Sequence, residues 1–218
     1  MSNNLRILAL ATGNAHKLQE FSEILAPAGW QVRSLKEWLP AIPEPDETEP
    51  DFQGNALLKA RFALEHLRQA RLESLPDALA ADDSGLAVDA LGGAPGVVSA
   101  RYAELAGRGS GDAANRAELL RNLSGKGSDR FDAGFVCAIA FLEIQTGRFL
   151  TVQGECRGQV GLVERGEGGF GYDSLFHPRF PDGTVAPTTF AQMTSEAKHG
   201  LSHRGDALQK LLTALSAE

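Results

Sequence analysis

Two adjacent carboxylates, Asp82 and Asp83, are of a residue type and in a position that could support chemistry. They come directly after the apolar run of Leu79, Ala80 and Ala81, where we expect a buried strand to end. Side chains alternate along a strand, so the two carboxylates should point to different sides. A carboxylate at the carboxyl end of a strand in an α/β fold can hold Mg²⁺, activate water, or do both. The alternative is that both carboxylates only cap the turn that follows.

An acidic, proline-rich stretch at residues 39–50 supplies further carboxylates. Its sequence, LPAIPEPDETEP, is not compatible with regular secondary structure. It contains Glu44, Asp46 and Glu47. Mg²⁺ typically takes only one or two carboxylates and leaves its other positions to water and phosphates. Together with the aspartate pair, this acidic loop favours a metal site.

The stretch ATGNAHK, residues 11–17, has the order strand, turn, helix, which points free backbone N–H groups at an anion. Thr12 and Asn14 add polar side chains, and Lys17 adds a positive charge one turn into the helix. The stretch is not a Walker A loop, because the G-x-x-x-x-G-K-[ST] spacing is absent. The alternative is a plain strand-to-helix turn that Asn14 caps.

Glycines at positions 166, 168 and 171 formally match G-x-G-x-x-G within residues 164–178. We reject a dinucleotide site, because no parallel strand of a βαβ unit precedes the match and Pro178 stops any helix soon after it. What remains is a glycine loop that presents Phe170, Tyr172 and Asp173. An aromatic ring beside glycines is well placed to lie flat on a planar base. The alternative is a bulged turn with core aromatics.

Positive charge gathers in residues 193–208 of an otherwise acidic chain. Lys198, His199, His203 and Arg204 lie there, and His203-Arg204 begins the last expected helix, where polar donors can aim at a ligand. A solvated helical face is the alternative. No Ser-His-Asp arrangement or G-x-S-x-G elbow accompanies these residues. Together, the stretches suggest a Mg²⁺-dependent enzyme that acts on a nucleotide.

The elements that must position these residues form an α/β pattern with a mixed sheet. The chain opens with an expected β-α-β unit and later forms a long antiparallel hairpin around Thr146-Gly147. Further strands and helices follow from apolar periodicity. We expect strands at 5–12, 30–35, 131–144 and 148–162, and one that ends at the aspartate pair; helices are expected within 14–29, from 52 to about 72, at 112–125, and in two C-terminal segments that start at 193 and 202.

Bulk composition narrows the class of protein. The chain has 218 residues, of which 43% are hydrophobic, and a formal net charge of −7, which argues against broad binding of nucleic acid. No apolar run approaches the roughly 20 residues of a membrane span, and no basic region precedes the first apolar run. We therefore expect a cytoplasmic protein that is not exported and has no membrane partner.

Of the two cysteines, Cys137 and Cys156, the first lies within FVCAIAF and is expected to be a buried thiol.

Four motifs, TGNAHKLQEF, ADDSGLAVDALGGAPGVVSARYA, GGFGYDSLF and SHRGDAL, occur in order over nearly the whole chain. They closely resemble the inosine triphosphate pyrophosphatase family, in its bacterial dITP/XTP pyrophosphatase branch. The resemblance implies a single domain over residues 1–218, with an elongated, two-lobed α/β fold around a long, highly twisted mixed β-sheet and the active-site cleft between the lobes. It also implies a Mg²⁺-dependent homodimer that hydrolyses non-standard purine nucleoside triphosphates (dITP/ITP, XTP/dXTP) to the monophosphate and pyrophosphate.

The resemblance also assigns roles to residues. It makes Asp83 the catalytic carboxylate and a metal ligand, and it places the second metal carboxylate at Asp46 or Glu47. That choice stays open, because the chain reads Asp-Glu-Thr-Glu-Pro where the family usually has Glu-Glu-Thr-Gly. The implied substrate contacts are Thr12, Gly13, Asn14, Ala15, His16 and Lys17 for the triphosphate, Lys59 for a phosphate, Ser84, and Phe170, Gly171, Tyr172, Asp173, Lys198, His203 and Arg204 for the nucleoside.

The choice of base follows from these donors. The donor groups that would favour a purine with a carbonyl at position 6 belong to Lys198, His203 and Arg204. Adenine would be rejected, because its amino group is also a donor and neither side would supply an acceptor. Two rival functions remain, a pyrophosphatase for modified pyrimidine or standard triphosphates and a catalytically silent nucleotide sensor. The presence of Asp83 and Lys17 argues against the sensor.

Overall fold

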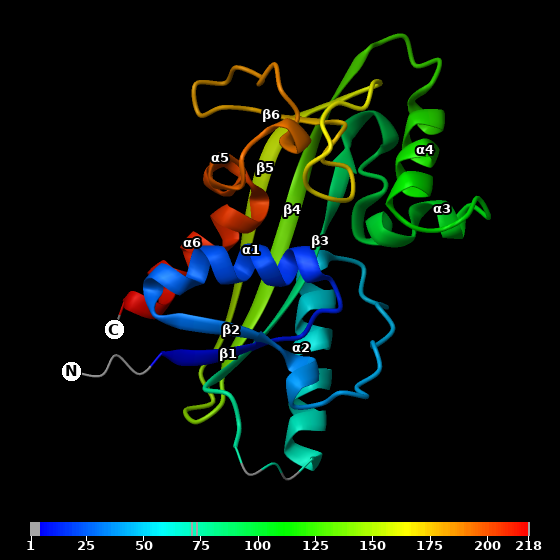
Figure 1. Cartoon of the computed structure of the whole chain (residues 1–218). Coiled ribbons are helices and arrows are strands. Elements are labelled where there is room, and N and C mark those ends of the chain that lie inside the picture. Colours follow the sequence, from blue (N-terminus) through cyan, green and yellow to red (C-terminus); the bar gives the residue numbers. More distant parts are fainter. Residues whose placement is uncertain (1–4, 71, 73, 218) are drawn as a thin grey trace. The chain divides into compact units, whose positions relative to one another are not determined.

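The computed structural model describes residues 5–70, 72 and 74–217, and its strands form a sheet in the order β2-β1-β3-β4-β5-β6 (Figure 1). The strands are β1 (Arg6–Leu10), β2 (Trp30–Ser34), β3 (Ala78–Val88), β4 (Arg130–Glu143), β5 (Phe149–Gly161) and β6 (Phe176–Pro178). The α-helices are α1 (Ala15–Leu25), α2 (Phe52–Gln69), α3 (Tyr102–Leu105), α4 (Asp112–Leu123), α5 (Ser195–Leu201) and α6 (His203–Ser216). Short 3-10 helices are η1 (Ala26–Ala28), η2 (Leu35–Glu37), η3 (Asp89–Leu91), η4 (Gly96–Arg101) and η5 (Phe190–Gln192).

The chain divides into two compact units. The first unit comprises the described residues up to Asp83, Cys137–Gly154 and the described residues from Ala207 onward. The second unit comprises Ser84–Val136 and Glu155–Asp206. Each unit has buried apolar clusters of its own, so each can hold functional side chains in place by its own packing.

The expected β-α-β opening is confirmed in the first unit. β1 pairs in parallel with β2, where Leu8 lies opposite Val32, and with β3, where Leu8 lies opposite Ala78. α1 starts after Asn14, whose side chain accepts hydrogen bonds from two backbone N–H groups of the first turn. Apolar residues recur along α1 at helical spacing, so that Phe21 is fully buried against the sheet.

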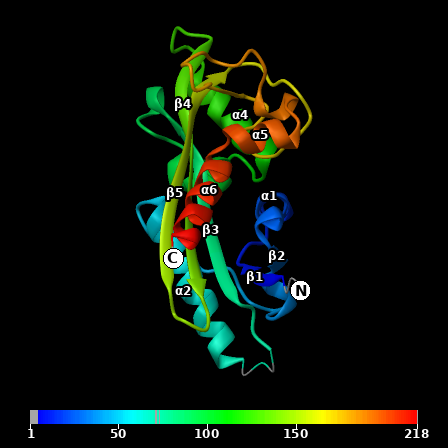
Figure 2. The ribbon, with the colours of Figure 1, turned by 90° about the vertical axis from the view of Figure 1, so that its left-hand side faces the viewer.

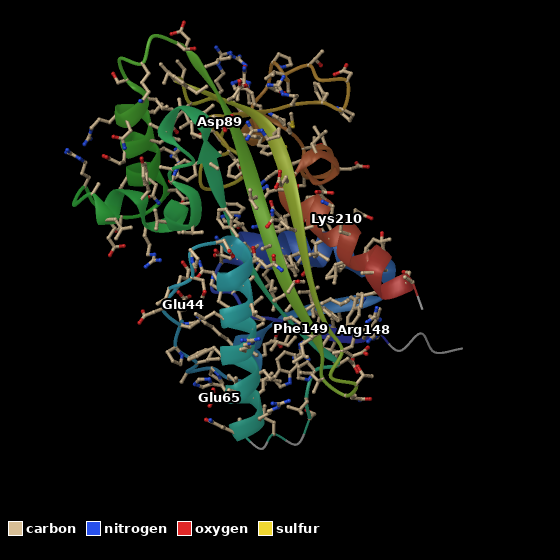
Figure 3. All side chains as sticks on the ribbon, turned by 180° about the vertical axis from the view of Figure 1, so that it is seen from behind. Glu44, Glu65, Asp89, Arg148, Phe149 and Lys210 are labelled. Carbon is tan, nitrogen blue, oxygen red and sulfur yellow. The ribbon has the colours of Figure 1, made fainter. Side chains whose placement is uncertain are left out.

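Helices cover both faces of the sheet in the first unit. Leu8 and Ala80 pack in the core under α1 and α6, whereas Ala9 and Leu79 pack in the core under α2. This division follows from the alternation of side chains along a strand. α1 lies in front of the strands in Figure 1, α2 lies in front of them in Figure 3, and Figure 2 shows the two helices on opposite sides of β3.

The contact between α2 and the sheet includes a cluster made of alanine. Ala56 and Ala60 of α2 pack with Ala81 of β3 and with Ala138 and Ala140 of β4, and all five side chains are buried. Because these side chains are small, the helix backbone can lie close to the strands. We call this set the alanine interface.

The prediction that a strand ends at Asp82 and Asp83 is wrong. β3 continues through both residues as far as Val88. The reason is burial, since Leu86 and Val88 are fully buried in the core of the second unit and keep the chain extended past the Ser-Gly pair. The glycine- and proline-rich turn begins only after η3, at Gly92, whose φ is +62°.

The other elements agree with the sequence pattern to within a few residues. β4 and β5 are neighbours in the sheet and are joined by residues 144–148, which confirms the predicted hairpin. α4, α5 and α6 lie where helices were expected. The helix predicted to reach about residue 72 ends at Gln69, and position 71 is outside the described residues.

Both cysteines are buried and free, which confirms the prediction for Cys137. Desolvation raises the pKa of the Cys156 thiol to about 12, so it stays protonated at neutral pH. In the part of the chain that the structure describes, no helix combines the length and the apolar character that crossing a bilayer requires.

Candidate active site

The turn between β1 and α1, in the first unit, has the polar groups that the sequence predicted. Thr12 Oγ1 accepts a hydrogen bond from the Asn14 N–H at 3.1 Å. Asn14 Oδ1 accepts from the N–H groups of His16, at 2.9 Å, and Lys17, at 3.2 Å. The capping role of Asn14 is therefore confirmed, and it makes this turn a rigid structure at the N-terminus of α1. Gly13 and the side chain of Glu44, labelled in Figure 3, are so close that a Cβ at Gly13 would lie 2.6 Å from Glu44 Oε1.

Lys17 forms an ion pair with the first of the two aspartates. Its Nζ lies 3.0 Å from Asp82 Oδ2, and the Asp82 side chain is fully buried. The Sγ of Cys137 lies 3.9 Å from the same oxygen, on the face of β3 that packs under α1 and α6. Asp82 thus holds Lys17 beside the turn at the start of α1.

Asp83 lies on the other face of β3, toward α2. Lys59 Nζ donates to Asp83 Oδ1 at 2.8 Å, and Asn55 Nδ2 donates to Asp83 Oδ2 at 3.3 Å. Burial raises the pKa of the Asp83 carboxyl, and the Lys59 ammonium opposes that effect only in part. A carboxylate with a raised pKa holds a proton more readily, which suits a general base.

Lys59 also contacts the acidic loop of residues 39–50. Its Nζ lies 2.5 Å from Glu47 Oε1, so one ammonium group is shared by Glu47 and Asp83. Burial by itself lowers the pKa of Lys59, but the two carboxylates outweigh burial and leave that pKa raised. Asp46 is exposed to solvent, so of the two alternatives in this loop, Glu47 is the residue that shares a cation with Asp83.

The arrangement of Asp83 and Glu47 fits a magnesium ion. Their oxygens converge on a single cation, here the Lys59 ammonium. Mg²⁺ usually takes one or two carboxylates and completes its octahedron with water and substrate phosphates. Among the described residues, no group of three or more His, Cys, Asp or Glu side chains is placed to hold a metal. A site of two carboxylates, completed by the substrate, is therefore the kind of metal site that these residues can form.

The second unit contains the glycine loop, which we define as residues 166–171. Phe170 N donates to Asp173 Oδ2 at 3.0 Å, and Lys198 Nζ donates to the same oxygen at 2.8 Å. Lys198 Nζ lies 5.0 Å from the centre of the Phe170 ring, and Arg204 Cζ lies 5.8 Å from it. Arg204 also donates to Ser84 Oγ at 2.9 Å. An aromatic ring and two cations are thus brought together, and such groups can stack on a planar ring and donate to a carbonyl.

Two predicted nucleoside contacts are placed differently from the rest. Tyr172 is buried, and its hydroxyl donates to the backbone oxygen of Ser99 at 2.8 Å. Its pKa is raised, chiefly by burial. His203 is also buried, and its ring stacks on Phe135 with 4.7 Å between ring centres. Both side chains support the core of the second unit, whereas Phe170 remains partly exposed on the glycine loop.

Comparison with known sequences agrees with this geometry, since residues 8–214 match the Ham1 family. The chain belongs to the Ham1 family. A relative from Desulforamulus reducens, named dITP/XTP pyrophosphatase, is 43% identical over 210 residues, which covers 96% of this chain and 95% of the relative.

Solved structures of Ham1 proteins have the same fold. The HAM1 protein of Coxiella burnetii is 33% identical, with a TM-score of 0.77 over 98% of this chain and 100% of that one. The nucleoside-triphosphatase, or dITP/XTP pyrophosphatase, of Mycobacterium abscessus is 40% identical, with a TM-score of 0.68 over 96% and 99% of the two chains. These similarities confirm the family resemblance and the α/β fold expected from the motifs.

Sequence reasoning missed three residues that hold the described groups in place, one in the first unit and two in the second. Asn55 is buried, and it exchanges hydrogen bonds with the backbone of Glu49 while it also donates to Asp83. Its position one turn before Lys59 on the same helix was a usable signal. Asp112 and Arg116 of α4 contact the glycine loop, and nothing local in the sequence indicates that contact.

Proposed function

We propose that this protein is a Mg²⁺-dependent pyrophosphohydrolase that converts non-standard purine nucleoside triphosphates, dITP/ITP and XTP/dXTP, to the monophosphate and pyrophosphate. The observation that carries the proposal is the convergence of Asp83 and Glu47 on the Lys59 ammonium. Two buried or half-buried carboxylates with a lysine between them suit a polyphosphate with its metal ion. The names of the relatives, dITP/XTP pyrophosphatase, support this choice of substrate.

In the proposed reaction, water attacks the α-phosphorus. A bond forms from the water oxygen to the α-phosphorus, and the bond from the α-phosphorus to the oxygen that bridges to the β-phosphate breaks, so pyrophosphate leaves. Asp83 accepts the proton that the water loses. Lys17 and Lys59 offset negative charge on the phosphates. When bound by Asp83 and Glu47, Mg²⁺ would supply further positive charge and acidify water.

The residues of the second unit support selection of the base. We propose that the Phe170 ring stacks on the purine and that Lys198 and Arg204 donate to the carbonyl at position 6. Adenine carries an amino group there, so two donors would face each other and each would lose its hydrogen bond to water. Asp173 holds Lys198 in position through the 2.8 Å ion pair.

The family resemblance also supports a homodimer that acts in the cytoplasm. Light scattering on the purified protein would give the mass in solution, and a mass of twice 23.2 kDa is expected. Fractionation of the producing cells would test the location.

The test of the proposed function is release of pyrophosphate from dITP, XTP, dATP, dGTP and dTTP, each with Mg²⁺ and with EDTA. Fast release from dITP and XTP that EDTA abolishes is the expected result. Release chiefly from dATP or dTTP would keep the phosphate chemistry but contradict the base selection. Binding of dITP without release of pyrophosphate would favour the sensor.

A further inference from the structure

The glycine loop is tied to helix α4 by both polar groups of one residue. The N–H of Gly171 donates to Asp112 Oδ2 at 2.6 Å, and the carbonyl of Gly171 accepts from Arg116 Nη1 at 3.0 Å. Asp112 and Arg116 lie one helical turn apart on α4, so their side chains extend from the same face of that helix.

Arg116 also secures the chain on either side of this loop. Its Nε donates to Glu164 Oε2 at 2.8 Å, and the same oxygen accepts from Ser174 Oγ at 3.0 Å. One guanidinium group therefore contacts Gly171 directly and, through Glu164, holds Ser174 beyond the loop. The planar fork of arginine directs two such bonds in fixed directions from a single side chain.

The ring of Phe170 depends on this attachment. Phe170 precedes Gly171, which has a φ of +60°, and a Cβ added to that glycine would meet no other atom within 4 Å. A glycine in open space has many alternative conformations, and the two bonds to α4 restrict them in addition to the bond from the Asp173 N–H to the Phe170 carbonyl at 3.2 Å. Asp112, Arg116 and Phe170 line one polar hollow of about 240 Å³, so the attachment lies next to the ring.

We propose that Asp112 and Arg116 are positioning residues for the purine base: they hold Gly171 so that the Phe170 ring is preorganised for stacking. The inference rests on the proposed function, because it takes a planar base as the ligand of Phe170. It assigns to α4 a role in affinity for the base and none in the cleavage of the phosphate bond. Preorganisation of this kind lowers the entropy lost when the ligand binds.

The test compares Asp112→Ala and Arg116→Ala with Asp112→Asn, which keeps an oxygen that can accept from Gly171. Arg121→Ala is the matched control, because Arg121 also lies on α4 but pairs with Glu118. We expect both alanine variants to raise KM for dITP about fivefold, the effect of the one bond to Gly171 that each of them loses, with kcat within about twofold of the parent. Asp112→Asn and Arg121→Ala should retain the parental KM.

Binding of inosine, measured by calorimetry, gives a readout that needs no turnover. The alanine variants should bind inosine about fivefold more weakly than the parent, while their thermal unfolding shows that they are folded. Unchanged KM and inosine affinity in both alanine variants would overturn the inference, as would equal losses in Asp112→Ala and Asp112→Asn. A parent protein that binds inosine but does not hydrolyse dITP would contradict the proposed function and leave the inference to be judged by inosine binding alone.

Discussion

Asp82 and Asp83 are chain neighbours, yet their carboxylates bind different lysines on opposite faces of β3. Asp82 pairs with Lys17 of α1 at 3.0 Å, and Asp83 pairs with Lys59 of α2 at 2.8 Å. The alternation of side chains along a strand produces this division. One aspartate therefore fixes a cation next to the turn at Asn14, and the other pairs with a cation on the α2 side, where we propose that it takes part in proton transfer and holds a metal ion.

The proposed role of Asp83 predicts a specific loss of rate. In Asp83→Asn the side chain keeps its shape but can no longer accept a proton, so kcat for dITP should fall about 1,000-fold. Thermal unfolding should remain a single cooperative transition. Asp182→Asn, at an exposed position, is the control and should have parental kcat. A turnover within tenfold of the parent in Asp83→Asn would remove Asp83 from the chemistry.

The contact between Glu47 and Lys59 predicts which residue of the acidic loop helps to hold magnesium. Glu47→Gln should raise the Mg²⁺ concentration for half-maximal activity at least about tenfold, since even outer partners of a metal contribute that much. Asp46→Asn should leave it unchanged. Titration of activity with Mg²⁺ at saturating dITP measures both. A larger shift in Asp46→Asn than in Glu47→Gln would reverse the assignment.

Asn55 connects the acidic loop to α2, and its removal should lower stability. Asn55→Ala loses the bonds to the backbone of Glu49 and the bond to Asp83, so the free energy of unfolding should fall by about 1–3 kcal/mol. Urea unfolding measures this change. The matched control is Gln53→Ala, which loses one exposed bond to Thr151 at the start of the same helix. Equal, small changes in the two variants would contradict a structural role for Asn55.

His177 should make stability fall in mild acid. Burial lowers its pKa, with further lowering by Arg130 and Arg165, and its Nδ1 bonds to the carbonyl of Ala186 at 3.1 Å. The unfolded chain, where histidine has a pKa of about 6.5, takes up the proton first, so stability is full above pH 6.5 and declines as pH falls toward the lower folded pKa.

The variant His177→Gln keeps a donor for Ala186 but does not titrate. Its free energy of unfolding, measured by urea at pH 8, 7, 6 and 5, should depend less on pH than that of the parent. Each unit of difference in pKa corresponds to about 1.4 kcal/mol of lost stability at low pH. Identical pH profiles for the variant and the parent would show that His177 is not the group responsible.

Local signals in the sequence were enough to predict much of this molecule. The start of α1 could be predicted because Asn14 caps its own helix, a contact over two or three residues. The course of β3 could not, because the Ser-Gly pair after Asp83 looks like a break. Only burial of Leu86 and Val88 among residues distant in sequence keeps that segment extended.

The candidate site was predictable in its residue types and less so in its contacts. The acidic loop has no periodicity, so spacing could not distinguish Asp46 from Glu47; the distinction comes from the loop folding back to Lys59. The family resemblance implies a substrate contact for Tyr172 as well as for Phe170; in the structure the Tyr172 side chain is buried and bonds to Ser99, whereas Phe170 is partly exposed. Residues two positions apart can therefore have very different surroundings, which spacing alone does not predict.

The alanine interface under α2 has a consequence for how Ham1 sequences can diverge. Ala56 is buried against the strands, and Lys59, one turn further along the same helix, reaches Asp83. A bulkier residue at position 56 would strain the contact between α2 and the strands, and a shift of the helix would move the ammonium group that Asp83 and Glu47 share. Substitutions at this packed position are therefore limited by the ion pairs of the neighbouring lysine. A larger residue there would be accepted only after a smaller residue had replaced one of the facing residues in β3 or β4.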